Sequence, residues 1–357
     1  MFSTQFMIHK LLVFFMLFTA VLRAQDTVKV AAEISPEQMA EQDYNKGLAS
    51  LKSNDFNTAI DLFSKCLAVK PTFDKAFVNR AIAFTQMKRY NEALADIYLA
   101  TKINPQNPET YFNKSLIFLG MNQRDSQNVA LDMCLSLNGG HSEAAYYKGL
   151  MSYQDHDVDK AIGYFTMAIA TRPNYVYAYN DRASAKRAKG DYAGAVSDYE
   201  KALIIDNSYA FIYNNLGSLH RAGKNYPRAI EAYSKAFEVD PKYLMALNNR
   251  GATYFESGDL KSAQSDFEEL LKKDANNSFA YNNLSSIAIK NTDYKRAKEL
   301  ATKSIELDPK NGAAYYNRGI ARQMLREEEG CCADWKKAFQ LGVDGAKAFI
   351  NASCTDQ

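Results

Sequence analysis

The amino-acid sequence predicts an all-α solenoid in which about nine helix pairs stack one after another. The first observation is an internal repeat: written in blocks of 34 residues from Ala40, the sequence comes into phase with itself nine times and ends at Gly345 without an insertion or deletion. The second is that small and large side chains recur at fixed positions in the blocks. A helix pair with one apolar face cannot cover that face alone, so neighbouring pairs are expected to stack.

Small side chains mark the places where the two helices of a pair would touch. Block position 8 holds glycine, alanine or serine in every block, and block position 20 holds alanine in seven of the nine. Large apolar side chains dominate position 24, as in Phe63, Phe165 and Trp335. The blocks cover residues 40–73, 74–107, 108–141, 142–175, 176–209, 210–243, 244–277, 278–311 and 312–345.

Helix-breaking residues separate the predicted helices. Turn-forming dipeptides such as Gly190-Asp191 lie between the two helices of a pair. Proline at block position 32 ends the second helix, because it lacks the amide hydrogen that a continuing helix needs. It occurs there as Pro71, Pro105, Pro173, Pro241 and Pro309.

This pattern resembles the tetratricopeptide-repeat (TPR) family, which has small residues at positions 8, 20 and 27, aromatic residues at 4, 11, 17 and 24, and proline at 32. The resemblance covers residues 40–345. It implies a right-handed superhelix of helix–turn–helix repeats whose concave groove is lined by the first helix of each repeat. It also implies a non-catalytic scaffold or adaptor that binds a protein or peptide partner.

The third block, residues 108–141, departs most from the pattern. Gln127 replaces the alanine at position 20, and Gly139-Gly140 replaces the proline region. Two interpretations stay open. The block is either a degenerate repeat that still stacks or a hinge between blocks 1–3 and blocks 4–9.

The N-terminal side of the array is predicted to begin with a capped helix. Ser35 can cap a helix that starts at Pro36, and Gln38 stands where the second partner of a capping box belongs. Residues 25–39 are therefore interpreted as a short tether followed by the start of a helix.

The C-terminal side is predicted to end in a capping helix. Ala346, Phe349 and Ile350 form one apolar stripe on a helix expected from Asp344 to Ser353, which would cover the last helix pair. Residues 346–357 are accordingly assigned to the capping helix and the C-terminus.

Residues 1–24 have the layout of a secretory signal peptide. His9 and Lys10 precede an apolar run from Leu11 to Leu22, which is shorter than the roughly 20 residues of a membrane-spanning helix. Cleavage after Ala24 would give an exported protein of the periplasm or cell surface without a stable membrane span. The alternative is an uncleaved signal anchor that tethers the protein to the membrane, since Leu22 is not the small residue that cleavage sites prefer.

The cysteines fit the repeat frame in two groups. Cys66 and Cys134 occupy position 27 and Cys331 occupies position 20, so these three are expected to be buried free thiols that pack like an enlarged alanine. Cys332 and Cys354 lie on the last repeat helix and at the end of the cap. A disulfide between them would tether the cap, and this region also resembles the closing repeat of exported bacterial TPR proteins.

The repeats leave no segment for a catalytic domain. The chain has no glycine-rich phosphate loop, no G-x-S-x-G motif and no paired-histidine zinc motif. Without residues 1–24 the chain has 41 basic and 41 acidic side chains, and a neutral chain offers little attraction for phosphate backbones. We predict no catalytic residue, no cofactor, no metal site and no nucleic-acid partner, with a groove-based enzyme as the remote alternative.

The candidate binding site lies on the first helices of blocks 5 to 8, where asparagine recurs at positions 5 and 6. An amide offers two donors and an acceptor, which suits the backbone of an extended peptide, and TPR superhelices that hold extended polypeptides use a similar ladder. Tyr177, Phe211 and Phe279 at position 2 could serve as apolar anchors. With the matching asparagine of block 9, the site residues at positions 5 and 6 are Asn180, Asp181, Asn214, Asn215, Asn248, Asn249, Asn282, Asn283 and Asn317.

Two alternatives to this site remain open. Asparagine at position 6 is common in the family and can instead satisfy local helix contacts. Outward-facing aromatic side chains could form a dimer face, which would make the protein a self-assembling homo-oligomer and a structural component of the cell envelope. A clamp for the carboxylate terminus of cytosolic chaperones is not predicted, because position 5, where the family's clamp carries lysine, holds no lysine in any block.

Overall fold

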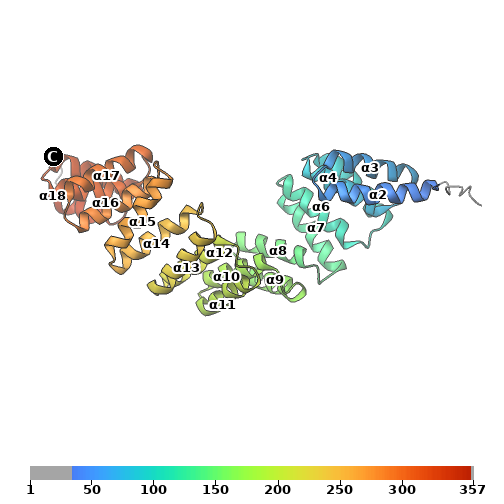
Figure 1. Ribbon diagram of the computed structural model, residues 1–357, viewed down its shortest axis with the longest axis horizontal. Helices are drawn as coiled ribbons and strands as arrows, with labels where there is room; N and C mark the ends of the chain where they lie inside the picture. Colours follow the sequence, from blue (N-terminus) through green and yellow to red (C-terminus); the bar gives the residue numbers. More distant parts are fainter. Residues whose placement is uncertain (1–33, 355–357) are drawn as a thin grey trace, which may run out of the picture. The chain divides into compact units, whose positions relative to one another are not determined.

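The computed structural model describes residues 34–354, and in that range the chain forms nineteen α-helices and no strand (Figure 1). Consecutive helices pack in pairs, which confirms the predicted all-α solenoid fold. The predicted signal peptide, residues 1–24, lies outside the described residues. Within residues 34–354, none of the helices combines the length and the apolar character that crossing a membrane requires.

The chain divides into two compact units. Unit 1 extends to Gly139 and unit 2 starts at Gly140, so the division falls near the end of block 3, the block that departs most from the repeat pattern. We number the repeats as the blocks are numbered. Repeats 1 to 3 in unit 1 consist of α2 (Pro36–Lys52) and α3 (Phe56–Val69), α4 (Asp74–Gln86) and α5 (Tyr90–Ile103), and α6 (Pro108–Gly120) and α7 (Arg124–Leu137).

Unit 2 contains repeats 4 to 9 and a final short helix, α20 (Ala346–Ser353). The first helices of these repeats are α8 (Ser142–Gln154), α10 (Val176–Lys189), α12 (Ala210–Ala222), α14 (Leu244–Ser257), α16 (Ser278–Lys290) and α18 (Gly312–Met324). The second helices are α9 (Val158–Thr171), α11 (Tyr192–Ile205), α13 (Tyr226–Val239), α15 (Leu260–Lys273), α17 (Tyr294–Leu307) and α19 (Glu328–Gln340).

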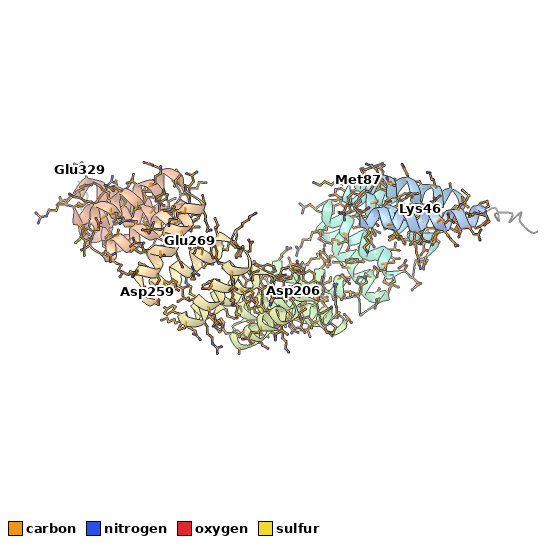
Figure 2. All side chains as sticks on the ribbon, in the orientation of Figure 1. Lys46, Met87, Asp206, Asp259, Glu269 and Glu329 are labelled. Carbon is orange, nitrogen blue, oxygen red and sulfur yellow. A yellow bond between two sulfur atoms is a disulfide. The ribbon has the colours of Figure 1, made fainter. Side chains whose placement is uncertain are left out.

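Local side-chain chemistry sets where the helices begin. The Ser35 hydroxyl accepts a hydrogen bond from the Gln38 amide at 3.2 Å, and the Gln38 side chain accepts one from the Ser35 amide at 3.0 Å, so the predicted capping box is confirmed. Most second helices start after an aspartate or asparagine at block position 16. Asp259 (Figure 2), for example, accepts a hydrogen bond from the Ser262 amide at the start of α15.

The core of most hairpins is a large side chain at position 24 packed against a small residue at position 8. A Cβ atom added to Gly217 would lie 2.8 Å from the Tyr233 ring, and one added to Gly319 would lie 2.4 Å from Trp335 Nε1. Only glycine lets the two helices approach this closely, because the contact is well inside van der Waals distance. Tyr233 and Trp335 are fully buried as a result.

The C-terminal helix covers the last hairpin. It begins at Ala346, two residues later than the Asp344 start expected from the apolar stripe, because Val343 to Gly345 form a turn in which the Val343 carbonyl accepts from the Ala346 amide at 3.0 Å. Its Phe349 ring packs 4.9 Å from the ring of Trp335.

A disulfide joins this helix to the array. The bond links Cys332 to Cys354, whose Cα atoms are 5.6 Å apart, so it fastens the end of α20 to α19. Cys66, Cys134 and Cys331 are buried and take no part in a disulfide, which confirms the prediction that they occupy packing positions.

Candidate functional site

The first helices of unit 2 form one continuous surface. Consecutive first helices contact one another from α8 to α18, whereas consecutive second helices make no comparable contact within this unit. A stack built in this way curves toward its first helices. We call the surface of α10, α12, α14, α16 and α18 the inner face, and every predicted binding residue lies on these helices.

The structure brings the predicted asparagines together as a ladder of amide pairs. The amide of each asparagine at position 6 donates to the amide oxygen at position 5 of the preceding repeat. The four pairs, with their Nδ2–Oδ1 distances, are Asn215 to Asn180 (3.0 Å), Asn249 to Asn214 (2.9 Å), Asn283 to Asn248 (3.2 Å) and Asn317 to Asn282 (2.9 Å).

In the first two pairs, the two asparagines have different roles. Asn180 and Asn214 at position 5 are buried, whereas Asn215, Asn249 and Asn283 at position 6 are partly exposed. Each of these three position-6 amides uses one donor in its pair and keeps a second N–H and its oxygen. Asn180 and Asn214 therefore orient the amides of Asn215 and Asn249, which reach solvent, whereas Asn248 and Asn282 at position 5 are themselves partly exposed.

In the last pair, the Asn317 amide has no N–H left to donate to a partner. Asn317 is buried, and its Nδ2 also lies 2.8 Å from Ser286 Oγ and 3.4 Å from the Asn282 carbonyl oxygen. Its donors are occupied within the protein, so Asn317 closes the ladder and is not a candidate contact for a partner.

The first member of the ladder is an aspartate. Asp181 Oδ2 accepts a hydrogen bond from the Tyr146 hydroxyl at 2.7 Å, and Oδ1 accepts one from Asn180 Nδ2 at 2.9 Å. Burial raises the pKa of Asp181, although both hydrogen bonds act in the opposite direction. This carboxyl group is therefore held by the same kind of inter-repeat contact as the asparagines that follow it.

An exposed apolar row runs beside the ladder at position 2. Tyr177 and Phe279 are 44% and 60% exposed, and Phe211 is partly exposed. Met245, 57% exposed, occupies the same position in repeat 7. Met245 was not among the predicted anchors because it is not aromatic, although its position in the repeat identifies it. We call Tyr177, Phe211, Met245 and Phe279 the apolar row.

Tyrosines at position 34 support this row from behind. The ring of Tyr209 lies 5.5 Å from those of Tyr177 and Phe211, and the latter two rings are nearly parallel at 6.3 Å. A hydrogen bond with Tyr177 raises the pKa of Tyr209. Tyr243 places its hydroxyl 3.6 Å from Met245 Sδ. These contacts fix the orientation of the row's first three side chains.

Serines and an ion pair complete the inner face. Position 9, which is leucine or isoleucine in repeats 1 to 4, is serine in repeats 5, 6 and 8. The Ser218 hydroxyl, for example, accepts from Tyr233 OH at 3.1 Å and donates to the Asn214 carbonyl at 2.9 Å. At position 12, Arg221 pairs with Glu256 of the next repeat at 2.5 and 3.0 Å. Beside the apolar row, the face thus carries polar side chains and an ion pair that is neutral overall.

Position-6 asparagines behave differently in unit 1. Asn113 donates to the Glu109 carbonyl of its own helix at 2.8 Å. Asn79 donates to the Lys75 carbonyl at 2.9 Å and to the Tyr44 hydroxyl at 3.0 Å. The alternative interpretation of local helix contacts therefore describes Asn113, and only repeats 5 to 9 pair asparagine with asparagine. Among residues 34–354, no group of three or more His, Cys, Asp or Glu side chains is placed to hold a metal ion.

Comparisons with known proteins agree with the repeat. Two models described as tetratricopeptide repeat match the chain, one over residues 174–242 and 203–275 and the other over residues 74–107 and 280–311. Among curated proteins, the chain is 43% identical over 58 residues to "Hsp70-Hsp90 organizing protein 1" of Arabidopsis thaliana, a match covering 16% of this chain and 10% of that protein. The "Hsp70-Hsp90 organizing protein 3" of the same plant is 38% identical over 58 residues, again 10% of its length.

Solved structures share the fold over longer stretches. A tetratricopeptide repeat protein from Parabacteroides merdae aligns with a TM-score of 0.56 and 18% identity, over 70% of this chain and 99% of that chain. The pilF protein of Pseudomonas aeruginosa aligns with a TM-score of 0.51 and 17% identity, over 59% of this chain and 96% of that chain. These structures show the shared fold, and the matches to tetratricopeptide-repeat models identify the chain as a member of that family, whose repeats imply a protein-interaction scaffold.

Proposed function

We propose that the protein is a non-catalytic scaffold that holds an extended, largely uncharged peptide segment of a partner on the inner face of repeats 5 to 8. The observation that carries the proposal is the parallel course of two features, the ladder of oriented amides and the apolar row. A peptide backbone needs donors and acceptors at regular intervals, and the position-6 amides offer both. Exposed apolar side chains in a row are typical of an interaction surface.

The chemistry of the face favours recognition of shape and backbone over recognition of charge. Arg221 and Glu256 neutralise each other, and the amides carry no charge. Such a surface discriminates weakly among polar side chains and gains affinity from buried apolar anchors. The "organizing" proteins that match over 58 residues do not narrow the partner further, since the shared segment is a tenth of their length.

The proposed location is outside the cytosol, in the periplasm or at the cell surface. The signal-peptide pattern of residues 1–24 motivates this proposal, and the Cys332–Cys354 disulfide supports it because such bonds persist in oxidising compartments. Whether the signal is cleaved, or anchors the protein to a membrane, stays a prediction. Self-assembly also stays a prediction, which light scattering on the purified protein tests.

The first test removes two members of the apolar row. Peptides selected from a random library for binding to the wild-type protein should bind the Met245→Ala/Phe279→Ala variant at least about tenfold more weakly, because exposed anchors of this size contribute on the order of 1–2 kcal/mol each. Both side chains are more than half exposed, so the melting temperature should hardly change. Titration calorimetry with the selected peptides measures the loss.

A matched control lies on a second helix of the same unit. Tyr192 and Ile204 on α11 are 59% and 76% exposed, so Tyr192→Ala/Ile204→Ala removes comparable apolar surface away from the inner face. Replacing Asn214, Asn215, Asn248 and Asn249 with alanine tests the ladder in the same assay. Equal affinity of the control variant and the apolar-row variant would contradict the proposed site.

A further inference from the structure

Some repeats contain a buried ion pair that fastens three helices together. In repeat 7, Arg250 at position 7 donates through Nε and Nη2 to the two carboxylate oxygens of Asp266 at position 23, at 2.8 and 2.7 Å. Its Nη1 donates to Ser234 Oγ, 3.1 Å away on the second helix of repeat 6. The arginine thus joins α13, α14 and α15. We call this arrangement an Arg–Asp tie.

The same tie recurs at equivalent positions in three other repeats. Each aspartate is at most 5% exposed, and a charge-assisted, two-pronged hydrogen bond at such a site is strong and directional. The hydroxyl partner is always at position 25 of the preceding repeat. The members are Arg80, Asp96 and Ser64 in unit 1, and Arg182, Asp198 and Thr166, then Arg318, Asp334 and Thr302 in unit 2.

Repeats 6 and 8 lack the tie. Leu216 and Ala232 replace the arginine and aspartate in repeat 6, and Leu284 and Leu300 replace them in repeat 8. In unit 2 the tie is therefore present at the junctions of repeats 4 and 5, 6 and 7, and 8 and 9. It is absent at the junctions of repeats 5 and 6 and of repeats 7 and 8.

Packing follows this alternation. The second helix of one repeat packs more extensively against the first helix of the next where the junction is tied (α9 on α10, α13 on α14, α17 on α18) than where it is not (α11 on α12, α15 on α16). The connecting loops differ as well: the tied junctions have Pro173, Pro241 and Pro309 at position 32, and the untied ones have Asn207 and Ala275. Proline stiffens a loop because its φ angle is fixed.

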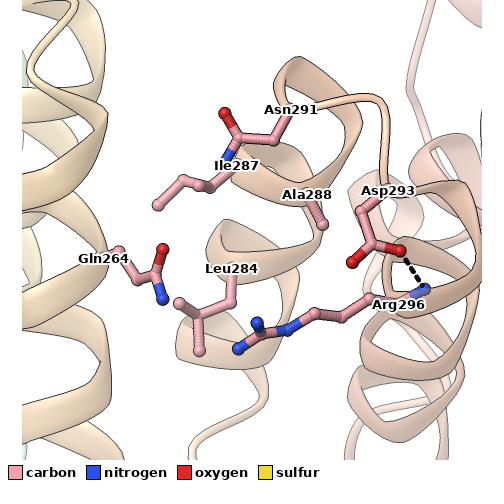
Figure 3. A pocket seen from close by; sticks show the side chains of 7 residues that line it. All are labelled: Gln264, Leu284, Ile287, Ala288, Asn291, Asp293 and Arg296. Carbon is pink, nitrogen blue, oxygen red and sulfur yellow. Dashed lines mark hydrogen bonds between the residues drawn. The ribbon is translucent and has the colours of Figure 1, made fainter.

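Open pockets lie beside both untied junctions. One of about 310 Å³ is lined mainly by α12 and α13 of repeat 6, including Leu216 and Ala232, and is bordered by Glu200 of α11 in repeat 5. A smaller one of about 60 Å³ is lined by residues of repeat 8 and, from repeat 7, by Gln264 of α15, which faces Leu284 of α16 (Figure 3). Helices with space between them can move relative to each other at little packing cost.

We propose that unit 2 bends in steps of two repeats. Repeats 4–5, 6–7 and 8–9 move as rigid modules, and the two untied junctions are the bending points. The amide pairs Asn215–Asn180 and Asn283–Asn248 cross these junctions on the inner face. They act as pivots while the side formed by the second helices opens and closes.

Bending of this kind would adjust the inner face of repeats 5 to 8 to its partner. That link rests on the proposed function, because it assumes that a peptide lies across both bending points. The bending itself does not rest on the proposed function, because it is inferred from contacts within unit 2. The test is therefore made on the protein without any peptide, so that failure of the binding site and failure of the bending model give different results.

The experiment measures distances between spin labels at block position 22, which is exposed on successive second helices. Label pairs Ser197→Cys/Glu231→Cys and Ser265→Cys/Glu299→Cys span the untied junctions, and Glu231→Cys/Ser265→Cys spans a tied one. The background replaces the three free cysteines with alanine, which suits positions 20 and 27, and keeps the disulfide. We expect broad distance distributions for the first two pairs and a narrow one for the third. Equal widths for all three pairs would overturn the proposal.

Two further variants test the role of the tie directly, because one adds it to an untied junction and the other removes it from a tied one. Glu200→Thr/Leu216→Arg/Ala232→Asp copies the residues of a tied junction into repeats 5 and 6, and should narrow the 197–231 distribution and slow amide exchange in α12 by roughly tenfold. Arg250→Leu/Asp266→Ala removes the tie between repeats 6 and 7, and should broaden the 231–265 distribution. If neither variant changed the width of its distance distribution, the role of the tie would be refuted.

Discussion

Repeats 6 and 7 are neighbours in unit 2. Their sequences agree on the inner face and differ on the side that packs against the preceding repeat. On the inner face both carry asparagine at positions 5 and 6, namely Asn214 and Asn215 in repeat 6 and Asn248 and Asn249 in repeat 7. On the other side of the first helix, repeat 7 has the Arg–Asp tie, whereas repeat 6 has Leu216 at position 7 and Ala232 at position 23.

This comparison shows that two different structural constraints act on two faces of one repeat. The asparagines at positions 5 and 6 stay the same in these two repeats, as the proposed extended peptide would require, since it would present the same backbone groups to each. Residues that face the neighbouring second helix alternate, because they decide how firmly two repeats are joined. In a solenoid, stability is close to a sum of repeat and nearest-neighbour terms, so the strength of each junction can vary without changing the inner face.

The largest expected effect comes from removing one member of the tie in repeat 7. Arg250→Leu leaves the Asp266 carboxylate, which is 5% exposed, without its arginine. Stranding one charge of a buried pair costs on the order of 3–5 kcal/mol. We expect a loss of about 3 kcal/mol in the free energy of unfolding, measured by urea denaturation of the purified protein.

The double variant Arg250→Leu/Asp266→Ala, which recreates the residue pair of repeat 6, is the control. Replacing both members of a buried ion pair with apolar residues is often close to neutral. Most of the stability lost in Arg250→Leu should therefore return, while the junction between repeats 6 and 7 loosens. A double variant as unstable as the single one would show that repeat 7 cannot adopt the packing of repeat 6.

A smaller effect is expected where repeat 5 departs from repeats 6 and 7 on the inner face. Asp181 stands where they have Asn215 and Asn249, and burial raises its pKa above the ordinary aspartate value of 3.8. A carboxyl group whose pKa is raised by folding favours the folded state below its unfolded pKa, and this contribution is lost as the pH rises through the folded pKa. Asp181→Asn should thus stabilise the protein at neutral pH by about 1 kcal/mol.

The pH dependence distinguishes this cause from better packing alone. The stability difference between Asp181→Asn and the wild type should grow as the pH rises above 3.8 and then level off above the folded pKa. Urea denaturation at a series of pH values from 4 to 8 measures it. A difference that is constant across this range would mean that ionisation of Asp181 does not limit stability.

Much of the fold could be predicted from the sequence because the repeat averages out local ambiguity. Position 24 is large in nearly every block and position 8 is small in all of them, and the structure packs them against each other, as in Tyr233 and Gly217. The capping box at Ser35 depends only on residues three apart, so it too was predictable. The start of α20 was misplaced by two residues because the apolar stripe does not reveal the turn before Ala346.

The site was only partly predictable. Position in the repeat predicted that Asn214 and Asn249 lie on the same face. It did not predict their hydrogen bond, because the 35-residue offset of the pairing depends on how the repeats stack. The tie was missed for a related reason: Arg250 and Asp266 look like ordinary surface charges in a sequence. Their recurrence at positions 7 and 23 of alternate repeats was the available signal, and it becomes meaningful once the helices are placed.

The smallest expected effect concerns the turns of repeats 6 and 7. Both turns place block position 15 in the left-handed region, with φ of +59° at Lys224 and +90° at Gly258. A side chain costs roughly 1 kcal/mol there, whereas glycine adopts the conformation freely but loses more entropy on folding. Lys224→Gly should therefore stabilise the protein by a few tenths of a kcal/mol, and Gly258→Ala should destabilise it by about 1 kcal/mol. Thermal unfolding of the two variants measures both, and because neither residue faces a neighbouring repeat, the label distances across the junctions should stay unchanged.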